Sequence, residues 1–427
     1  MVTRWPSRRT RSANLEAAAQ YQNALELLRS LPETAERRAS ELEIQLALGG
    51  CFIASHGYSS GETRKAFESA CSLSAELGEQ RKELQAIFGL WGHFWMRAQH
   101  DRAIQLGEML LARADQLRDL MALVVGWRCL GSTLFTLGDF VRARDHLDRA
   151  VALGQQSTTE ESALTYAVDP RIAAQLLLAW DLWILGYPDQ ALHNVLQAQL
   201  RAKQRGEPYT TAFAYYVTSA VQLLRGEAQA SLASAEQSLA LSREHHISLY
   251  ALYSRFGRGC ALASLRQLEP AMAEIKGGIE EARRINLGYM RGFMLGWLAA
   301  TEAQSGEPEI ALSILDEAFE HISDVAGRAW EAELLRLRGD ILFAASPQAT
   351  AEAEQNYISA INVARRQSAR SLELRAATSL ARLLRAQGRS NEVRSRLAPL
   401  LAWFTEGLDT ADVKDAKALL EGLQCEV

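Results

Sequence analysis

The chain has 427 residues, of which 48% are hydrophobic and 23% charged, so it can bury a large core and is not intrinsically disordered. Only 9 prolines and 28 glycines interrupt it, too few for the many turns of an all-β protein. Its net charge of −5, from 46 basic and 51 acidic residues, gives no bulk attraction to nucleic acid or to an anionic membrane. We expect neither as a partner.

The five cysteines lie far apart without a CxxC pair, which argues against a disulfide framework and a zinc site. The most apolar run, from Ala173 to Leu185, contains Gln175 and Asp181 and is too short to cross a bilayer. Basic residues open the chain, but Asn14 and Glu16 stand where a signal peptide needs its apolar segment. These features predict a cytoplasmic protein.

In chain order, residues 1–14 are expected to be disordered or unrelated to the fold, and residues 15–48 to form one or two capping helices broken at Leu31-Pro32. From about 49 to 402 a small residue recurs at intervals of 37, 40, 48, 40, 40, 40, 42 and 40. These residues are Ala66, Ala103, Ala143, Ala191, Ser231, Ala271, Ala311, Ala353 and Val393. The longer intervals predict polar loops at 154–162 and near 346–350, and a last capping helix is expected at about 403–423.

Around the third of these positions the sequence resembles the tetratricopeptide pattern W-x2-L-G-x2-Y followed by A-x3-F-x2-A. The match consists of Trp127, Leu130-Gly131, Ala143 and Ala150, with leucine at both aromatic positions. A glycine often stands five residues before the small residue, where it suits the left-handed end of a first helix; these are Gly138, Gly186, Gly226, Gly306 and Gly388. One hairpin cannot bury its apolar face alone, so hairpins must stack. We predict an all-α, right-handed, tetratricopeptide-like superhelical solenoid over residues 15–427, with about nine helical hairpins of roughly 40 residues.

Motifs for catalysis are scarce. Gly57-Tyr-Ser-Ser-Gly61 matches the G-x-S-x-G elbow of serine hydrolases, but it falls between two expected helices, so we interpret it as a loop. No Gly-Lys phosphate loop occurs, and the histidines, including His245-His246, lack metal-ligand spacing. The arginine-rich stretch 328–396 is typical of a solvated helix face rather than a nucleic-acid site. We predict that the chain is not an enzyme and has no catalytic, cofactor-binding or metal-binding residue.

A series of aromatic residues forms the strongest candidate site. In tetratricopeptide geometry the second, fifth, ninth and twelfth positions of each first helix face the concave groove. Here these positions hold Phe88, Trp95, Arg128, Phe135, Trp180, Trp183, Phe213, Tyr216, Tyr253, Phe256 and Phe293. Such a ladder can bind an apolar peptide, a helix or a small ligand. The alternative is that the rings are plain core, and full burial of Phe213, Tyr253 and Phe293 would eliminate the groove hypothesis.

Longer segments resemble the C-terminal region of bacterial multidomain proteins in which a class III adenylate cyclase domain and an AAA-type ATPase precede a tetratricopeptide solenoid. They are Arg11–Asn14 with Glu16-Ala17, Ala24–Leu28, Leu185–Leu192, Trp330–Leu334, Glu373–Leu383, Trp403–Gly407, Asp409–Asp412 and Lys414–Lys417. The cyclase's metal-binding aspartates and the ATPase's phosphate loop have no counterpart here, so no catalytic residue can be transferred. The resemblance begins near Arg11, and we expect the chain to be a gene fragment, a split operon member or the product of an alternative start.

This resemblance implies a non-catalytic scaffold for protein–protein interaction, the regulatory tail of a signalling protein, with a cyclase or AAA-type ATPase module as partner and no cofactor. One alternative is a sensor domain of a signal-transduction ATPase or transcription regulator that binds a small-molecule effector. A pocket closed by the 154–170 loop would favour the sensor, and an open groove a protein partner. The other alternative is a fragment of an adenylate cyclase protein without its catalytic residues. Without upstream modules, the N-terminal face around Leu25, Leu28 and Leu46 is expected to be exposed and to cause self-association.

Overall fold

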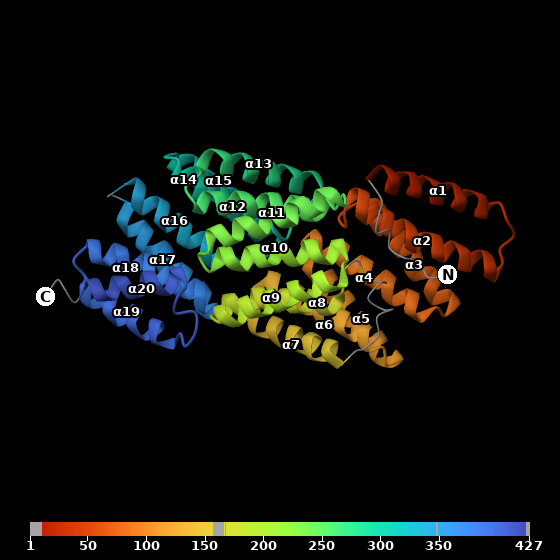
Figure 1. Ribbon diagram of the computed structural model, residues 1–427, viewed down its shortest axis with the longest axis horizontal. Helices are drawn as coiled ribbons and strands as arrows, with labels where there is room; N and C mark the ends of the chain where they lie inside the picture. Colours follow the sequence, from red (N-terminus) through yellow and green to blue (C-terminus); the bar gives the residue numbers. More distant parts are fainter. Residues whose placement is uncertain (1–10, 157–165, 167, 347–348, 424–427) are drawn as a thin grey trace.

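The computed structural model describes residues 11–156, 166, 168–346 and 349–423, with side chains from residue 15 onward. These residues form twenty helices and no strand, which confirms the all-α prediction. The helices are α1 (Arg11–Arg29), α2 (Ala35–His56), α3 (Gly61–Leu77), α4 (Gln80–Met96), α5 (His100–Leu117), α6 (Leu120–Leu137), α7 (Phe140–Gln156), α8 (Pro170–Leu185), α9 (Pro188–Arg205), α10 (Pro208–Leu224), α11 (Ala228–Glu244), α12 (Ser248–Ser264), α13 (Leu268–Arg284), α14 (Arg291–Gln304), α15 (Pro308–Val325), α16 (Glu331–Ala345), α17 (Thr350–Arg366), α18 (Arg370–Ala386), α19 (Ser390–Trp403) and α20 (Ala411–Gly422). The first and last helices lie at opposite ends of an elongated molecule (Figure 1).

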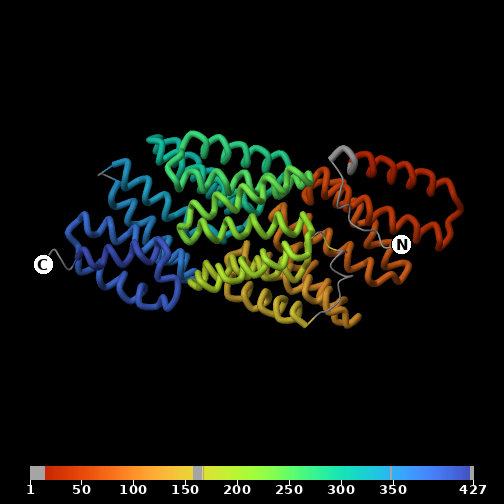
Figure 2. Tube along the Cα trace, viewed as in Figure 1, coloured from red at the N-terminus to blue at the C-terminus, as the bar shows by residue number. Residues whose placement is uncertain are grey.

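Consecutive helices of the described chain pair into nine hairpins, from α2–α3 to α18–α19, and the trace passes from each hairpin to the next (Figure 2). Every one of the nine predicted small residues lies in the second helix of its hairpin and is fully buried, except Ala66 at 4% exposure. Small side chains there allow the two helices to approach closely. At Gly131, for example, an added Cβ would lie only 2.6 Å from Cγ of Leu147. The fold is the predicted tetratricopeptide-like solenoid.

A single residue in the left-handed conformation ends the first helix of most hairpins. The predicted glycines all have positive φ: 81° at Gly138, 96° at Gly186, 84° at Gly226, 95° at Gly306 and 73° at Gly388. Ala98 and Arg266 occupy the equivalent positions between α4 and α5 and between α12 and α13, with φ of 58° and 61°. These two L-residues carry conformational strain that glycine avoids.

Substitutions at the equivalent turns should therefore have opposite effects. Gly306→Ala should lower the free energy of unfolding by about 1–2 kcal/mol, the cost of a left-handed L-residue. Arg266→Gly should raise it by about 0.5 kcal/mol, because the relief of strain exceeds the entropy cost of glycine. Urea unfolding would measure both, with Gly61→Ala as the control, since Gly61 has open space around it and no positive φ. Equal effects of the two turn variants would contradict this account.

Three helix boundaries differ from the prediction. Helix α2 continues through Gly49 to residue 56 and forms the first helix of a hairpin, and the ring of Phe67 on α3 occupies the space where a Cβ on Gly49 would lie. Helix α1 begins at Arg11, before the expected boundary at residue 15. Helix α20 begins only at Ala411, because the chain after α19 turns through Gly407, which has a φ of 65°.

The expected exposed leucine face at the N-terminus is wrong. Leu25 and Leu46 are 7% and 6% exposed, and Leu28 is partly buried. Helix α1 packs along α2, and Leu25 belongs to a small apolar cluster with Phe52. The first hairpin is therefore covered by α1.

The winding of the superhelix brings segments about 190 residues apart into contact. Carbonyl oxygens at the C-terminal ends of α4, α6, α8 and α10 accept hydrogen bonds from residues about 190 positions later in the chain. The pairs are Gly288 N to Met96 O (2.7 Å), Ala329 N to Thr136 O (3.3 Å), Ser371 Oγ to Trp183 O (2.5 Å) and Ala411 N to Arg225 O (3.2 Å). A helix cannot satisfy its last carbonyls internally, so each turn of the superhelix supplies donors to the previous one. About five hairpins complete one superhelical turn.

Ion pairs strengthen the contact near the C-terminus. Arg225 is 4% exposed and donates to Asp189 at 2.8 Å, to Glu227 at 2.7 Å and to Asp409 at 3.5 Å. The carboxylate of Glu406 accepts hydrogen bonds from the backbone amides of Asp189 and Gln190, at the N-terminus of α9, where a negative charge is favourable. The segment after α19 is thereby fixed against the fourth and fifth hairpins.

Helix α6 is apolar and long enough to cross a membrane by length and composition alone, but 72% of it is buried inside the fold. It packs against α5, α7 and α8. Its apolar character is accounted for by this packing, as in the core helix of a soluble protein.

Candidate functional site

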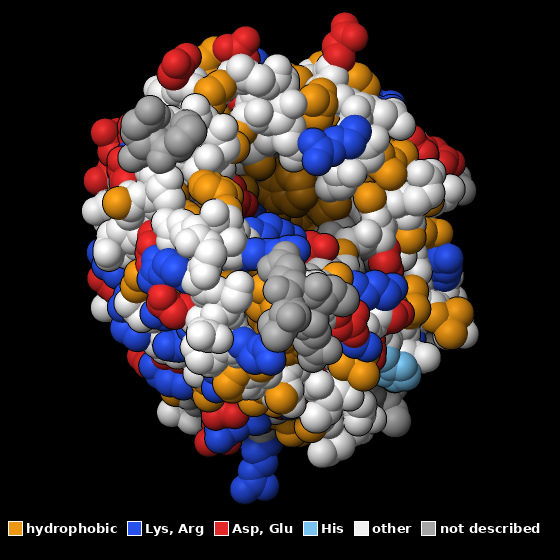
Figure 3. Space-filling model, turned by 90° about the vertical axis from the view of Figure 1, so that its left-hand side faces the viewer, with side chains coloured by type: hydrophobic (Ala, Val, Ile, Leu, Met, Phe, Trp, Pro, Cys, Tyr) orange, Lys and Arg blue, Asp and Glu red, His pale blue; other side chains and the backbone are white. Residues whose placement is uncertain are grey.

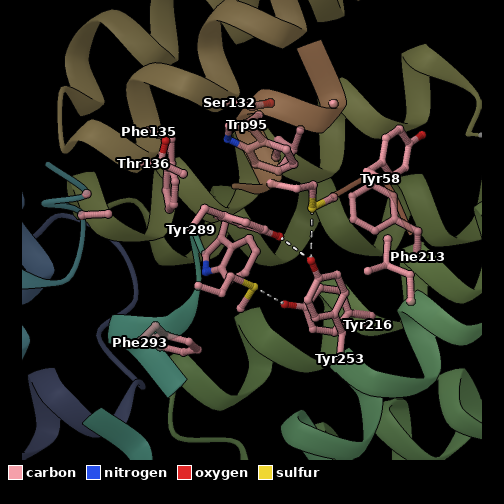
Figure 4. Close-up of a pocket in the computed structure, with 18 of the residues that line it drawn as sticks. Tyr58, Trp95, Ser132, Phe135, Thr136, Phe213, Tyr216, Tyr253, Tyr289 and Phe293 are labelled. Atoms are coloured by element: carbon pink, nitrogen blue, oxygen red, sulfur yellow. Dashed lines mark hydrogen bonds between the residues drawn. The ribbon is translucent and has the colours of Figure 1, made fainter. Parts of the chain in front are cut away.

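The concave side of the superhelix encloses a cavity of about 100 Å³. Fourteen of its thirty lining residues are Phe, Tyr or Trp, which makes the lining predominantly aromatic. These rings come from α4, α6, α8, α10, α12 and α14, and from the segments that precede α3, α14 and α16. Figure 4 shows the rings of Trp95, Tyr289 and Tyr253 around this space. The cavity therefore lies between the second to sixth hairpins and the segments that begin the seventh and eighth, where the next turn of the superhelix starts.

Nine of the eleven residues predicted for the groove line this cavity: Phe88, Trp95, Arg128, Phe135, Trp180, Phe213, Tyr216, Tyr253 and Phe293. Tyr253 is only 2% exposed, but Phe213 and Phe293 are partly buried. The condition that would have eliminated the groove hypothesis is therefore not met. A binding role for these residues remains a prediction.

Trp183 and Phe256 lie outside this lining. Trp183 is 1% exposed and packs under the guanidinium of Arg375, whose central carbon is 4.7 Å from the ring centroid. Residues three apart on a helix point about 60° away from each other, so Trp180 faces the cavity while Trp183 faces α18. Phe256 lines a small adjoining cavity of about 20 Å³ together with Trp180 and Tyr216.

Several lining residues were missed from the sequence. Tyr209, Tyr250, Tyr289 and Trp330 stand at or just before the start of successive first helices, at intervals of 41, 39 and 41. This spacing follows the 40-residue repeat and is the signal that would have found them. Tyr58, by contrast, comes from the loop between α2 and α3, outside the periodic positions.

Ring contacts join the two superhelical turns across the cavity. Trp95 stacks on Tyr289 with centroids 4.3 Å apart, and the hydroxyl groups of Tyr289 and Tyr253 are 3.0 Å apart (Figure 4). The Tyr216 and Tyr253 hydroxyls donate to the sulfur atoms of Met290 and Met96, at 3.6 and 3.7 Å. Burial raises the pKa of both phenols well above the ordinary value, so they remain neutral donors.

Among the described residues of the lining, Arg128 of α6 is the only Lys or Arg, and none is Asp or Glu. It is 9% exposed, and its guanidinium carbon lies 5.1 Å from the ring centroid of Phe88 and 5.3 Å from that of Trp91. Within the described chain its Nε has no hydrogen-bond partner, and the same holds for Nε1 of Trp95 and of Trp180. The cavity thus combines apolar walls with hydrogen-bond donors that have no acceptor among the described residues.

A second cavity, of about 510 Å³, shares Phe293 and Trp330 with the first. Glu333, Arg336 and Arg375 line it, and each of the two arginines forms an ion pair with Glu333. Although burial opposes it, the charges of Arg336 and Arg375 lower the pKa of Glu333 to about 2. Seen from the C-terminal end, the molecule has a deep hollow with hydrophobic side chains inside and basic side chains at its edge (Figure 3).

The expected loop at 154–162 falls mainly on residues outside the described part, which omits 157–165 and 167. Of its described neighbours, Val168 lines the cavity, and the ring of Tyr166 meets Phe88 edge-on with centroids 5.0 Å apart. The described end of this segment therefore contributes to one wall.

The hydrolase-like motif forms the loop between α2 and α3. Gly57 ends α2 with a φ of 85°, and the side chain of Ser60 caps α3 by accepting a hydrogen bond from Thr63 N at 3.1 Å. His245 likewise ends α11. No three His, Cys, Asp or Glu residues are placed to hold a metal ion in the part of the chain that the structure describes.

Asp181 of α8 is a buried polar group outside the cavity lining. It is 0% exposed, and neither carboxylate oxygen has a hydrogen-bond partner among the described residues. Burial raises the pKa of its carboxyl well above the ordinary value. Arg144 acts against this shift, but Arg144 itself donates to Asp148 at 3.3 Å, and the charges of Asp148 and Asp139 reinforce the rise. The folded chain therefore holds a proton on Asp181 that the unfolded chain releases.

Asp181→Asn should change how stability depends on pH. Above about pH 4, where an unfolded aspartate ionises, the folded chain binds more protons than the unfolded chain until the raised pKa is reached. Stability then falls as pH rises, by up to about 1.4 kcal/mol per pH unit from this group. Asparagine does not titrate, so the stability of the variant relative to the original chain should increase between pH 4 and 7 in urea unfolding. A relative stability that stays constant over this range would contradict the prediction.

Comparison with known proteins shows the fold and leaves the family open. No family model matches the chain. An uncharacterized protein of Rhizobium meliloti (strain 1021), R02095, is 25% identical over 387 residues, which cover 88% of this chain and 36% of the relative. The chain thus spans about a third of that protein's length.

Two of the solved structures that resemble the chain illustrate its fold. One is a Rap protein complexed with competence and sporulation factor, with 14% identity, a TM-score of 0.51, and coverage of 89% of this chain and 95% of that one. The other is the Rap conjugation gene regulator of plasmid pLS20 in complex with the Phr* peptide, with 10% identity, a TM-score of 0.50 and 98% coverage of both chains. These likenesses show that the chain has the fold of tetratricopeptide-like helical repeat proteins.

Proposed function

We propose that the chain is a non-catalytic regulatory solenoid of a bacterial, cytoplasmic signalling protein, and that it senses a small ligand with an apolar ring in the aromatic cavity. The observation that carries this proposal is the concentration of fourteen aromatic side chains around one enclosed space. Aromatic side chains offer large, rigid apolar contact area, and a few convergent polar groups orient a ligand among them.

The enclosure of the concave face favours a ligand over a folded protein as the occupant. Hydrogen bonds between superhelical turns, such as Gly288 N to Met96 O, cover the face that an open solenoid would present to a partner. A ligand small enough to enter from the hollow at the C-terminal end can still reach the rings. The Rap regulator of pLS20 was solved with the Phr* peptide, which supports a short peptide as an alternative ligand for a fold of this kind.

Ligand binding would be sensed through the winding of the superhelix. The cavity walls belong to two successive turns, with Trp95 on the first and Tyr289 on the second. A ligand that contacts both walls stabilises the wound state relative to any opened state. Amide hydrogen exchange at Gly288 and Ala329, whose amides bridge the turns, should therefore slow when the cavity is occupied.

The second candidate is a scaffold that binds a separate protein module, such as a cyclase or AAA-type ATPase. The length of the relative, of which the chain spans only about a third, supports a setting within a larger assembly. So do the segments that resemble the C-terminal region of cyclase–ATPase proteins. In this arrangement the convex surface or the ends of the solenoid would contact the module.

The size of the ligand that the cavity prefers tests whether the cavity is the binding site. Toluene should raise the thermal unfolding midpoint of the original chain, while naphthalene should bind it weakly. Trp95→Ala enlarges the cavity and should tighten naphthalene binding at least tenfold, because larger cavities accept larger apolar ligands. The matched control is Trp127→Ala, which deletes a partly buried tryptophan outside the lining and should leave both affinities unchanged. Absence of toluene binding, or equal behaviour of the two variants, would count against the proposal.

A further inference from the structure

Arg128 differs from the other deeply buried arginine that the structure describes. Arg225 is surrounded by three carboxylates, whereas Arg128 makes no ion pair with any described residue and its Nε has no hydrogen-bond partner among them. A guanidinium has five N–H donors and stays charged at any ordinary pH. Removing such a charge from water is costly unless a partner compensates it. Here the rings of Phe88 and Trp91 supply only a partial compensation through their faces.

The unused polar groups of the lining are all of one kind. Nε of Arg128, Nε1 of Trp95 and Nε1 of Trp180 are shielded from solvent, and each is a donor without an acceptor in the described chain. They stand on the successive first helices α6, α4 and α8. The described lining residues include no Asp or Glu, so none of them offers a carboxylate to these donors. A ligand that is complementary to this site must therefore carry hydrogen-bond acceptors for these donors and a negative charge for the guanidinium.

A carboxylate meets both requirements. It is an acceptor-only, planar group that matches the fork of a guanidinium. The rest of the cavity wall around Arg128 is aromatic, and its volume of about 100 Å³ is close to the size of cavity that holds a single ring. From these observations we propose that the ligand is an aromatic carboxylate, whose carboxylate pairs with Arg128 and whose ring lies among the aromatic side chains. This inference rests on the proposed function, since it specifies the ligand of the same cavity.

The test compares phenylacetate with phenylacetamide, which has the same ring without the charge. Isothermal titration calorimetry at neutral pH should show that the original chain binds the acid at least tenfold more tightly than the amide. Arg128→Met should weaken acid binding at least tenfold and leave amide binding unchanged. Arg149→Met is the matched control: Arg149 also lies over a tryptophan, Trp127, with its guanidinium carbon 4.8 Å from the ring centroid, but it is outside the lining.

A second measurement separates a binding role from a structural one. Without ligand, Arg128→Met should unfold at the same or a higher temperature than the original chain, because the substitution removes an uncompensated buried charge. A large loss of stability together with an unchanged acid-to-amide ratio would overturn the inference. If Arg128→Met does not fold, Arg128→Lys keeps the charge without the fork and should weaken acid binding while amide binding stays the same.

The outcomes also distinguish this inference from the proposed function. If toluene binds in the cavity but the acid and the amide bind equally, the carboxylate inference fails and the sensor proposal stands. If toluene, acid and amide all fail to bind, both fail. A peptide that ends in phenylalanine, compared with its C-terminal amide, identifies the source of the carboxylate. Tighter binding of the free peptide than of phenylacetate supports the pairing with Arg128 and assigns the carboxylate to a peptide terminus.

Discussion

Close packing at one small residue per hairpin is the constraint on which this structure depends. At the nine positions from Ala66 to Val393, a larger side chain would push the second helix away from the first. Uniform spacing makes every hairpin nearly the same thickness, so the rotation from one hairpin to the next is also nearly constant. A regular superhelix follows from that repetition without any special contact between distant parts.

The winding of this superhelix then turns an ordinary concave surface into a site. Once about five hairpins have completed a turn, the carbonyls that end α4, α6, α8 and α10 meet donors from the later half of the chain. Aromatic side chains that would line an open groove in a looser solenoid face each other across an enclosed space instead. The same closure shields Arg128 from solvent while leaving it without a counter-ion in the described chain.

Local and periodic features were predictable from the sequence, and contacts between superhelical turns were not. The 40-residue interval placed the hairpins and the left-handed glycines, and tetratricopeptide geometry identified nine of the lining residues. Tyr58 was missed because it lies in a loop, outside the periodic positions. Trp183 was wrongly assigned to the cavity because its direction on α8 differs by about 60° from that of Trp180, and this difference decides which side chain faces inward. The exposed face around Leu25 was wrong because the packing of α1 on α2 has no periodic signal. Among the described residues, Nε of Arg128 and the carboxylate of Asp181 have no hydrogen-bond partner, and this depends on residues distant in sequence, so it appears only in three dimensions.

The pairing of early carbonyls with late donors has a consequence for how such a chain can change in length. In an open solenoid, duplication or loss of one hairpin merely lengthens or shortens the array. Here the partners of Met96 and Thr136 lie just under five repeats downstream, so an added unit between them would present the wrong segment to each carbonyl. This architecture tolerates gene rearrangements that keep the number of hairpins between these partners. It also tolerates rearrangements that add hairpins only at the two ends of the chain.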